Sequence, residues 1–164
     1  MNGIEDEIDV YTDGSFIKKK KNIKCGYGVY FPNDEYKSIG RKFTHEPITN
    51  NRAELYAILK AIILCNKVNE SRKKHKLQKI TKITIYTDSE YSVNTLTKWY
   101  KQWIKNGKKY LNKDIIDLII DAINKVNFKV KLQHVRAHTG KKDKHSVGND
   151  KADELAKAGA NRIT

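Results

Sequence analysis

Four acidic residues of this 164-residue chain stand where a carboxylate can do chemistry. Two of them, Asp13 and Asp88, follow the same Tyr-Thr dipeptide at the end of a short run of strand-forming residues. If the two runs are parallel neighbours in a sheet, the two carboxylates lie side by side, where open α/β sheets bind ligands. The alternative for either residue alone is a turn or helix cap, a common role for Asp.

Glu54 and Asp153 fall on the inward faces of predicted helices. Glu54 shares a face with Ile58 and Ile62, and Asp153 lies one turn before Ala156 on a face of small residues. A buried carboxylate without a cation is costly or becomes protonated, so a cluster of inward carboxylates implies a bound cation. Oxygen ligands without a Cys or His cluster suit Mg²⁺ or Mn²⁺ rather than zinc.

The charge of the chain favours a polyanionic partner. Lys and Arg outnumber Asp and Glu by 33 to 19, which gives a formal net charge of +14. Nucleic acid is the commonest partner of so basic a protein, and a solvated Lys-rich surface is the alternative. Charge alone does not decide between them, so the motifs must.

The sequence argues against export and membrane insertion. The acidic start, Met1–Val10, lacks the features of a signal peptide. The longest apolar stretch, Ala57–Cys65, contains Lys60 and is far shorter than the roughly 20 residues that a bilayer needs. Cys25 and Cys65 lack metal-ligand spacing and are predicted to be reduced, packed thiols. We therefore expect an intracellular protein, which fits cytoplasm and nucleus equally.

The order of predicted elements indicates an α/β protein in which residues 1–164 form one domain. Its core is expected to be a five-stranded mixed sheet with helices on both faces. The strands are predicted at Ile8–Asp13, Cys25–Phe31, Tyr36–Phe43, Ile83–Asp88 and Phe128–Val135. The helices are predicted at Asn50–Val68, with Thr49 or Asn50 as N-cap, Glu90–Lys105, Lys113–Val126 and Asn149–Ala160. Exposed loops are predicted at the lysine-rich segments Lys18–Lys24, Arg72–Lys79 and Gly140–His145.

Five motifs follow one another along the chain: Tyr11-Thr12-Asp13-Gly14-Ser15, Thr49–Leu55, Tyr86-Thr87-Asp88-Ser89, Val135–Gly140 and Gly148–Ala156. The first is weak alone, but in this order the five resemble type 1 ribonuclease H over essentially the whole chain. The resemblance implies the ribonuclease H-like fold. It also implies an endonuclease that hydrolyses the RNA strand of RNA/DNA hybrids and leaves 5′-phosphate and 3′-hydroxyl ends. We expect a monomer with no obligate protein partner.

The same resemblance implies the metal-binding residues. Asp13, Glu54, Asp88 and Asp153 would hold two Mg²⁺ ions, with Mn²⁺ as a substitute. Paired metals can activate a water for attack on the phosphate and stabilise the departing ribose 3′ oxygen. The segment 141–147 is longer than expected, which leaves Asp150 as an alternative fourth ligand.

Two histidines are expected to differ in role. His138 would be the loop residue that assists proton transfer or product release in the family, and an exposed loop histidine is the alternative. His134 alternates with Phe128, Val130 and Leu132, so we expect a packed strand residue.

Substrate contacts are also implied by the resemblance. The backbone near Gly14 and Ser15 would approach the RNA ribose, and Asn50 and Asn51 would contact the minor groove, with helix capping as their alternative. A basic protrusion at about 98–112 would bind the DNA strand, and its Trp pair has a core stripe as the alternative. The residues expected to form the DNA channel and phosphate pocket are Tyr91, Trp99, Trp103, Thr49 and Asn112. Pro47, where an Arg is frequent, would weaken that pocket.

Two other classes of protein compete with this interpretation. Integrases, transposases and junction resolvases share the fold and cut DNA with a similar carboxylate cluster. The Asn50–Glu54 run and the Trp-containing basic segment argue against them. A hybrid-binding module without catalysis is disfavoured because an unused acidic cluster would repel phosphates. The start at Met1, close to the first strand, favours an independent protein over a segment of a reverse transcriptase.

Overall fold

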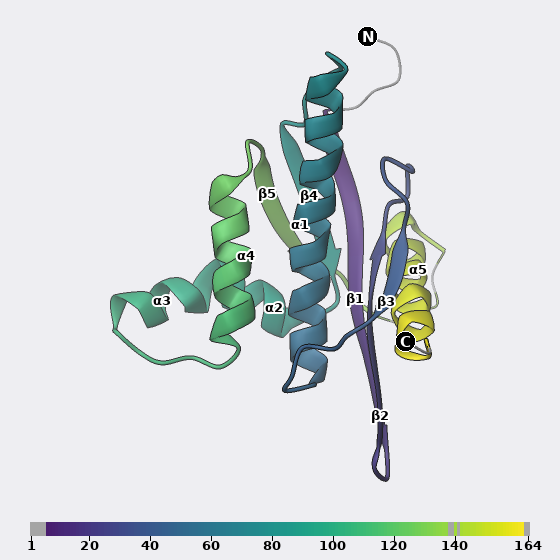
Figure 1. Cartoon of the computed structure of the whole chain (residues 1–164), viewed down its shortest axis with the longest axis vertical. Coiled ribbons are helices and arrows are strands. Elements are labelled where there is room, and N and C mark those ends of the chain that lie inside the picture. The colour runs from purple at the N-terminus through teal and green to yellow at the C-terminus, as the bar shows by residue number, and fades with distance from the viewer. Residues whose placement is uncertain (1–5, 138–139, 141, 163–164) are drawn as a thin grey trace.

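A five-stranded mixed sheet forms the centre of the molecule, with helices on both faces (Figure 1). The computed structural model describes residues 6–137, 140 and 142–162. The strands are β1 (Glu7–Lys19), β2 (Asn22–Tyr30), β3 (Ile39–Lys42), β4 (Lys82–Thr87) and β5 (Lys129–His134), in the order β3-β2-β1-β4-β5. The pairs β1–β2 and β2–β3 are antiparallel, whereas β1–β4 and β4–β5 are parallel. The predicted fold class is confirmed.

Helices cover the sheet unequally on its two faces. They are α1 (Asn50–Lys74), α2 (Glu90–Asn94), α3 (Tyr100–Lys105), α4 (Lys113–Lys125) and α5 (Lys144–Ala160), with a π-helical turn, Thr95–Trp99, between α2 and α3. Figure 1 shows α1 and α4 on one face and α5 on the other. Ile58 and Ile62 of α1 are fully buried, as is Ile85 of β4. Burying each such side chain contributes about 1.5–3 kcal/mol.

Two predicted strand boundaries are wrong. The predicted loop at Lys18–Lys24 is instead part of a hairpin, because β1 continues to Lys19 and pairs there with Asn22 of β2. Backbone pairing needs no buried side chains, so exposed lysines can continue a strand. The strand predicted at Tyr36–Phe43 is only Ile39–Lys42. Ser38 Oγ accepts a hydrogen bond from Phe31 N at 2.9 Å, so a side chain replaces the ladder there.

The last helix begins at Lys144 rather than at the predicted Asn149. Asp143 is its N-cap, and Asp143 Oδ1 accepts a hydrogen bond from Ser146 N at 2.9 Å. The loops predicted at Gly140–His145 and 141–147 are therefore wrong from Lys144 onward. The first turn of α5 is held on β1, since Tyr11 Oη lies 2.7 Å from His145 Nδ1.

Further along, α5 lies in backbone contact with β2 and β3. A Cβ built at Gly28 would lie 2.4 Å from Ala152 O, and one at Gly40 would lie 2.2 Å from Leu155 O. Real Cβ atoms do not approach so closely, so only glycine allows α5 to pack at this distance. These glycines set how far Asp153, carried by α5, stands from β1.

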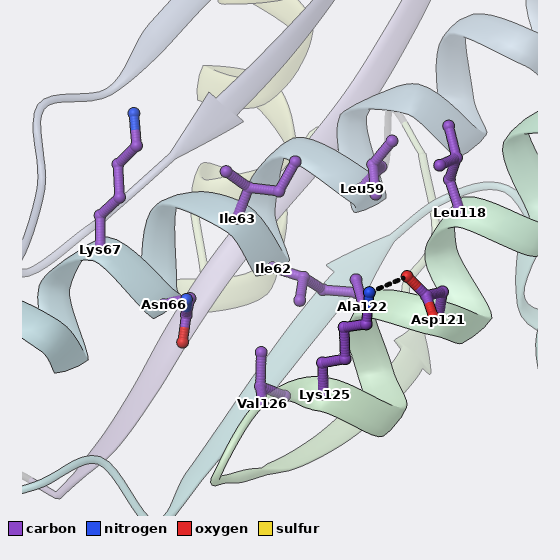
Figure 2. Close-up of a pocket in the computed structure, with 10 residues that line it drawn as sticks. All are labelled: Leu59, Ile62, Ile63, Asn66, Lys67, Leu118, Asp121, Ala122, Lys125 and Val126. Atoms are coloured by element: carbon purple, nitrogen blue, oxygen red, sulfur yellow. Dashed lines mark ion pairs between the residues drawn. The ribbon is translucent and has the colours of Figure 1, made fainter.

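A shallow apolar groove of about 470 Å³ lies between α1 and α4 (Figure 2). Its walls include Leu59 and Ile63 of α1 and Leu118 of α4, whereas Lys125 and Asp121 form an ion pair at 2.9 Å on its rim. None of the described residues that line it is a predicted site residue. The groove therefore belongs to the packing of the two helices and not to the candidate site.

The cysteines and the helices bear on the predicted thiol state and on membrane insertion. Cys25 and Cys65 are free and buried, as predicted. Among the helices of the described residues, none combines the length and apolar character that crossing a membrane requires.

We expect Gly28→Ala to lower the free energy of unfolding by about 1–3 kcal/mol, because the added methyl group must push α5 away from β2. Urea unfolding followed by circular dichroism measures the change. Lys24→Ala, at an exposed position of the same strand, serves as the control and should cost less than about 0.5 kcal/mol. Equal stability of Gly28→Ala and the wild type would show that α5 is not held at this distance.

Candidate active site

Carboxylates from three elements meet at one end of β4. Asp13 belongs to β1, Glu54 to α1 and Asp88 directly follows β4, and their ligand oxygens all lie within 4.8 Å of one another. The parallel register explains why Asp13 and Asp88 lie close together, since Thr12 is paired with Thr87 and the next residues are Asp13 and Asp88. The two strands are neighbours, as the sequence predicts, but Asp13 lies within β1 and not at its end.

Glu54 reaches this cluster because α1 begins directly against β1. A Cβ at Gly14 would lie 2.8 Å from Glu54 N, so glycine is needed for the approach. Thr49 is the N-cap of α1, and its Oγ1 accepts a hydrogen bond from Arg52 N at 3.1 Å. Asn50, the other predicted cap, is instead the first helical residue, and Asn50 and Asn51 are both exposed.

The cluster is buried and carries only like charges. Asp13 is 4% exposed and Glu54 is 5% exposed, and Glu54 Oε2 has no hydrogen-bond partner. Burial raises the pKa of Asp13, and the charges of Glu54 and Asp88 raise it further. Burial and the charge of Asp88 also raise the pKa of Glu54. Without a cation, the cluster must therefore retain protons.

A fourth carboxylate approaches Asp13 from α5. Asp153 is among the groups that raise the pKa of Asp13, and it pairs with Lys157 at 2.9 Å. It is outside the group of three mutually close carboxylates. The alternative, Asp150, is exposed on the same helix. Asp153 is thus the α5 carboxylate beside the cluster, and a cation bound there would compete with Lys157.

The donor set fits a hard divalent cation. All three mutually close residues offer oxygen atoms, and the group contains no Cys or His. The unpartnered Glu54 Oε2 is a buried acceptor that a cation would satisfy.

Comparison with known proteins agrees with the fold. The model of the RNase H family matches residues 5–161. The chain belongs to the RNase H family. Its relatives include the probable ribonuclease H of Acanthamoeba polyphaga mimivirus, which is 38% identical over 84% of this chain and 58% of that protein. Ribonuclease HI of Haemophilus influenzae is 30% identical over 96% of this chain and 92% of that protein.

A solved structure shows the same fold. The foamy viral protease-reverse transcriptase in complex with RNA/DNA hybrid matches with a TM-score of 0.70 and 20% identity, over 95% of this chain and 20% of that chain. This chain spans about half the length of the eukaryotic ribonucleases H that it matches.

Arg52 is a buried residue of this RNase H family site whose role the sequence analysis missed. It is 2% exposed, and its Nη1 and Nη2 each lie 2.8 Å from a carboxylate oxygen of Asp114 in α4. It also donates to the backbone carbonyls of His45 and Glu46. The sequence held a signal, because Arg52 shares a helix face with Leu55 and Leu59. Arg52 ties the start of α1 to the start of α4.

The predicted phosphate pocket lies around Arg52. Asn112 Oδ1 is 3.4 Å from Arg52 Nη1, and Asn112 Nδ2 donates to Tyr91 Oη at 2.9 Å. Thr49 is bonded to the backbone N of Arg52. Pro47 is exposed and follows Glu46, one of the carbonyl acceptors of Arg52. Thr49 and Asn112 thus both contact Arg52, Thr49 at its backbone N and Asn112 at its guanidinium group, although they are far apart in sequence.

The basic segment carries a chain of aromatic rings. Tyr91 and Trp99 have ring centroids 6.3 Å apart, Trp99 and Trp103 6.2 Å, and Trp103 stacks on Tyr110 at 5.3 Å. Tyr91 and Trp103 pack against the core, so the core-stripe alternative holds in part. The neighbouring Lys98, Lys101, Lys105, Lys108 and Lys109 are exposed.

One of the two histidines lies in a different environment from the one predicted. His134 is predicted to be a packed strand residue, which is wrong: its side chain is 36% exposed and lies 3.9 Å from Glu90. It ends β5, which is an edge strand, so the alternation of the strand does not bury it. His138 lies outside the described residues.

We expect the metal-free protein to lose part of its stability as the pH rises. Because the pKa values of Asp13 and Glu54 are raised in the folded state, folding binds protons above about pH 4, where the unfolded chain releases them. Asp13→Asn should therefore stabilise the protein in EDTA by an amount that grows between pH 5 and 8 and reaches about 1 kcal/mol or more. Urea unfolding at three pH values tests this, with Asp150→Asn as a control that removes an exposed charge. A stabilisation independent of pH would contradict the expectation.

We expect Arg52 and Asp114 to be energetically coupled. Asp114 is largely exposed, which reduces the value of the pair, but the two parallel hydrogen bonds are charge-assisted. A double-mutant cycle with Arg52→Met and Asp114→Asn should give a coupling energy of about 1–2 kcal/mol at pH 7. The arginine beside Asp114 lowers the pKa of that carboxyl to about 2. The coupling should therefore persist from neutral pH down to about 4 and disappear as the pH falls through about 2. Additive effects at pH 7 would refute it.

Proposed function

We propose that this chain is an endonuclease that hydrolyses the RNA strand of RNA/DNA hybrids with two Mg²⁺ ions. It would leave 5′-phosphate and 3′-hydroxyl ends, and Mn²⁺ would substitute for Mg²⁺. The convergence of Asp13, Glu54 and Asp88 within 4.8 Å, in a chain of the RNase H family, carries the proposal. The solved relative that is in complex with RNA/DNA hybrid supports the substrate class.

The carboxylates have distinct positions in the proposed mechanism. Asp13, Glu54 and Asp88 would hold the metal site, and Asp153 would complete it from α5 on leaving Lys157. When bound, the paired ions supply an activated water and stabilise the leaving 3′ oxygen. His138 would move the proton or assist release of the product. The rigid β1 and β4 backbones keep two of the ligands in place while substrate binds.

The proposed substrate surface surrounds the carboxylates. Asn50 and Asn51 are exposed in the first turn of α1, beside Glu54, where they can reach the minor groove. The backbone at Gly14 and Ser15 would meet the RNA ribose next to Asp13. Thr49 and Asn112 would bind a DNA phosphate, and the rings of Tyr91, Trp99 and Trp103 would contact the DNA strand.

The proposal extends to the organisation of the chain. Residues 1–164 would act as one catalytic domain and as a monomer, because the acidic cluster draws all its described members from a single sheet and the helices on it. The buried, free Cys25 and Cys65 support a reducing, intracellular setting.

We expect the protein to cut only the RNA strand of a strand-labelled hybrid, in Mg²⁺ or Mn²⁺ and not in EDTA. Asp13→Asn and Asp88→Asn should each lower the rate by about a hundredfold or more, because metal stabilisation of the transition state contributes several kcal/mol. Asp150→Asn removes the same charge from an exposed site and should leave the rate within about twofold.

Three results would count against the proposal. Cutting of double-stranded DNA would assign the site to the resolvase and integrase class. Tight hybrid binding without cleavage would favour a binding module. Full activity of Asp88→Asn would remove the carboxylate cluster from the mechanism. Mapping of the product ends tests the predicted 5′-phosphate and 3′-hydroxyl separately.

A further inference from the structure

The hairpin that joins β1 to β2 carries a second group of positive charges. Five of the seven residues in Lys18–Lys24 are lysines, and all seven residues are exposed. The lysines that form ion pairs in the described part of the chain are Lys82, Lys113, Lys125, Lys144, Lys151 and Lys157. None of these lies in the hairpin, so its charges are available to an external anion.

The hairpin extends directly from the candidate active site. β1 continues without interruption from Asp13 to Lys19, which places Lys19 about 20 Å beyond the carboxylates at the usual rise of a strand. Alternate residues of a strand share a face, so Lys19 lies on the same face of β1 as Asp13. Lys24 is paired with Ile17 and shares that face. A hollow of about 250 Å³ lined by Ile17, Lys19, Asn22, Lys24 and Asn161 agrees with this placement.

The hairpin and the segment around α3 flank the start of α1. In Figure 1 the hairpin tip and α3 lie on opposite sides of the N-terminal half of α1, which carries Glu54. Both flanking elements present exposed lysines, and α1, which lies between them, contributes Glu54 to the acidic cluster. The phosphates of a duplex repeat every ~3.4 Å along each strand. A duplex that crosses the carboxylates and extends past them on both sides would therefore meet the lysines of both elements.

The tip of the hairpin carries a lysine in a backbone conformation that other residue types prefer. Lys20 has a φ of 56°, a conformation in which Gly or Asn is the usual residue. A lysine there is mildly strained, yet it places an ammonium group at the outermost point of the arm.

We propose that the β1–β2 hairpin is a lysine arm that binds the phosphate backbone of the substrate duplex about 20 Å from the carboxylates. The arm adds to the contacts made around α3 and lengthens the stretch of RNA/DNA hybrid that the protein holds. The identity of the duplex rests on the proposed function, whereas the phosphate contact depends only on the charges and placement of the hairpin.

Salt-dependent binding of a hybrid in EDTA tests the arm, because each lost phosphate contact lowers the slope of log K against log[salt] by about 0.7–0.9. The arm variant is Lys19→Gln, Lys20→Asn, Lys21→Gln and Lys24→Gln. Its matched control is Lys73→Gln, Lys74→Gln, Lys76→Asn and Lys79→Gln, at the other end of α1, about 37 Å from its start. Each set removes four exposed lysines, and Lys76, like Lys20, has a positive φ.

We expect the arm variant to lower the salt slope by about 2 or more and the affinity about tenfold or more, and the control to change the slope by less than about 1. Replacing Lys19, Lys21 and Lys24 by Arg should retain wild-type binding, which shows that loss reflects charge and not misfolding. Equal effects of the two sets, or unchanged binding of the arm variant, would overturn the proposal. Absence of RNA cleavage by the wild type would instead refute the proposed function and leave this binding comparison decisive for the arm.

Discussion

The mutual repulsion of Asp13, Glu54 and Asp88 is the constraint on which the rest of the structure depends. Three carboxylates within 4.8 Å, two of them buried, would separate if the backbone allowed it. The strands β1 and β4 prevent separation because their ladder locks Thr12 opposite Thr87. The core beneath α1 prevents it for Glu54, because Ile58 and Ile62 hold the helix on the sheet. Stabilisation by packing thus maintains an arrangement that a cation would relieve.

The start of α1 is where structure and chemistry are most closely joined. Within the first turn and a half, Thr49 caps the helix, Arg52 binds Asp114 of α4, and Glu54 enters the carboxylate cluster. Gly14 permits this turn to lie against β1. A shift of α1 would consequently disturb the carboxylate cluster and the contacts of Arg52 with Asp114 and Asn112 together. The two sites are coupled through one rigid element and need no separate device to keep their spacing.

The acidic cluster and the lysine-rich segments lie in different parts of the molecule. The acidic cluster is small and recessed, whereas lysines project from the segment around α3 and from the β1–β2 hairpin. In the proposed function, the exposed charges would attract a polyanion, which would meet the carboxylates only where a cation neutralises them. The close glycine contacts between α5 and the sheet set the distance of Asp153 from Asp13. Asp153 therefore adds a fourth carboxylate near the acidic cluster.

Most elements and the inward direction of the key carboxylates could be predicted from local sequence, because periodicity and turn chemistry are local. The equal positions of Asp13 and Asp88 in their motifs and the helical spacing of Glu54 with Ile58 sufficed to place them at one site. Three features depend instead on tertiary contacts: β1 continues into a lysine hairpin, α5 begins at Lys144, and His134 ends an exposed edge strand. The partner of Arg52, Asp114, is distant in sequence and was equally hidden. Each of these depends on which surfaces and strands become neighbours, and no local pattern encodes that.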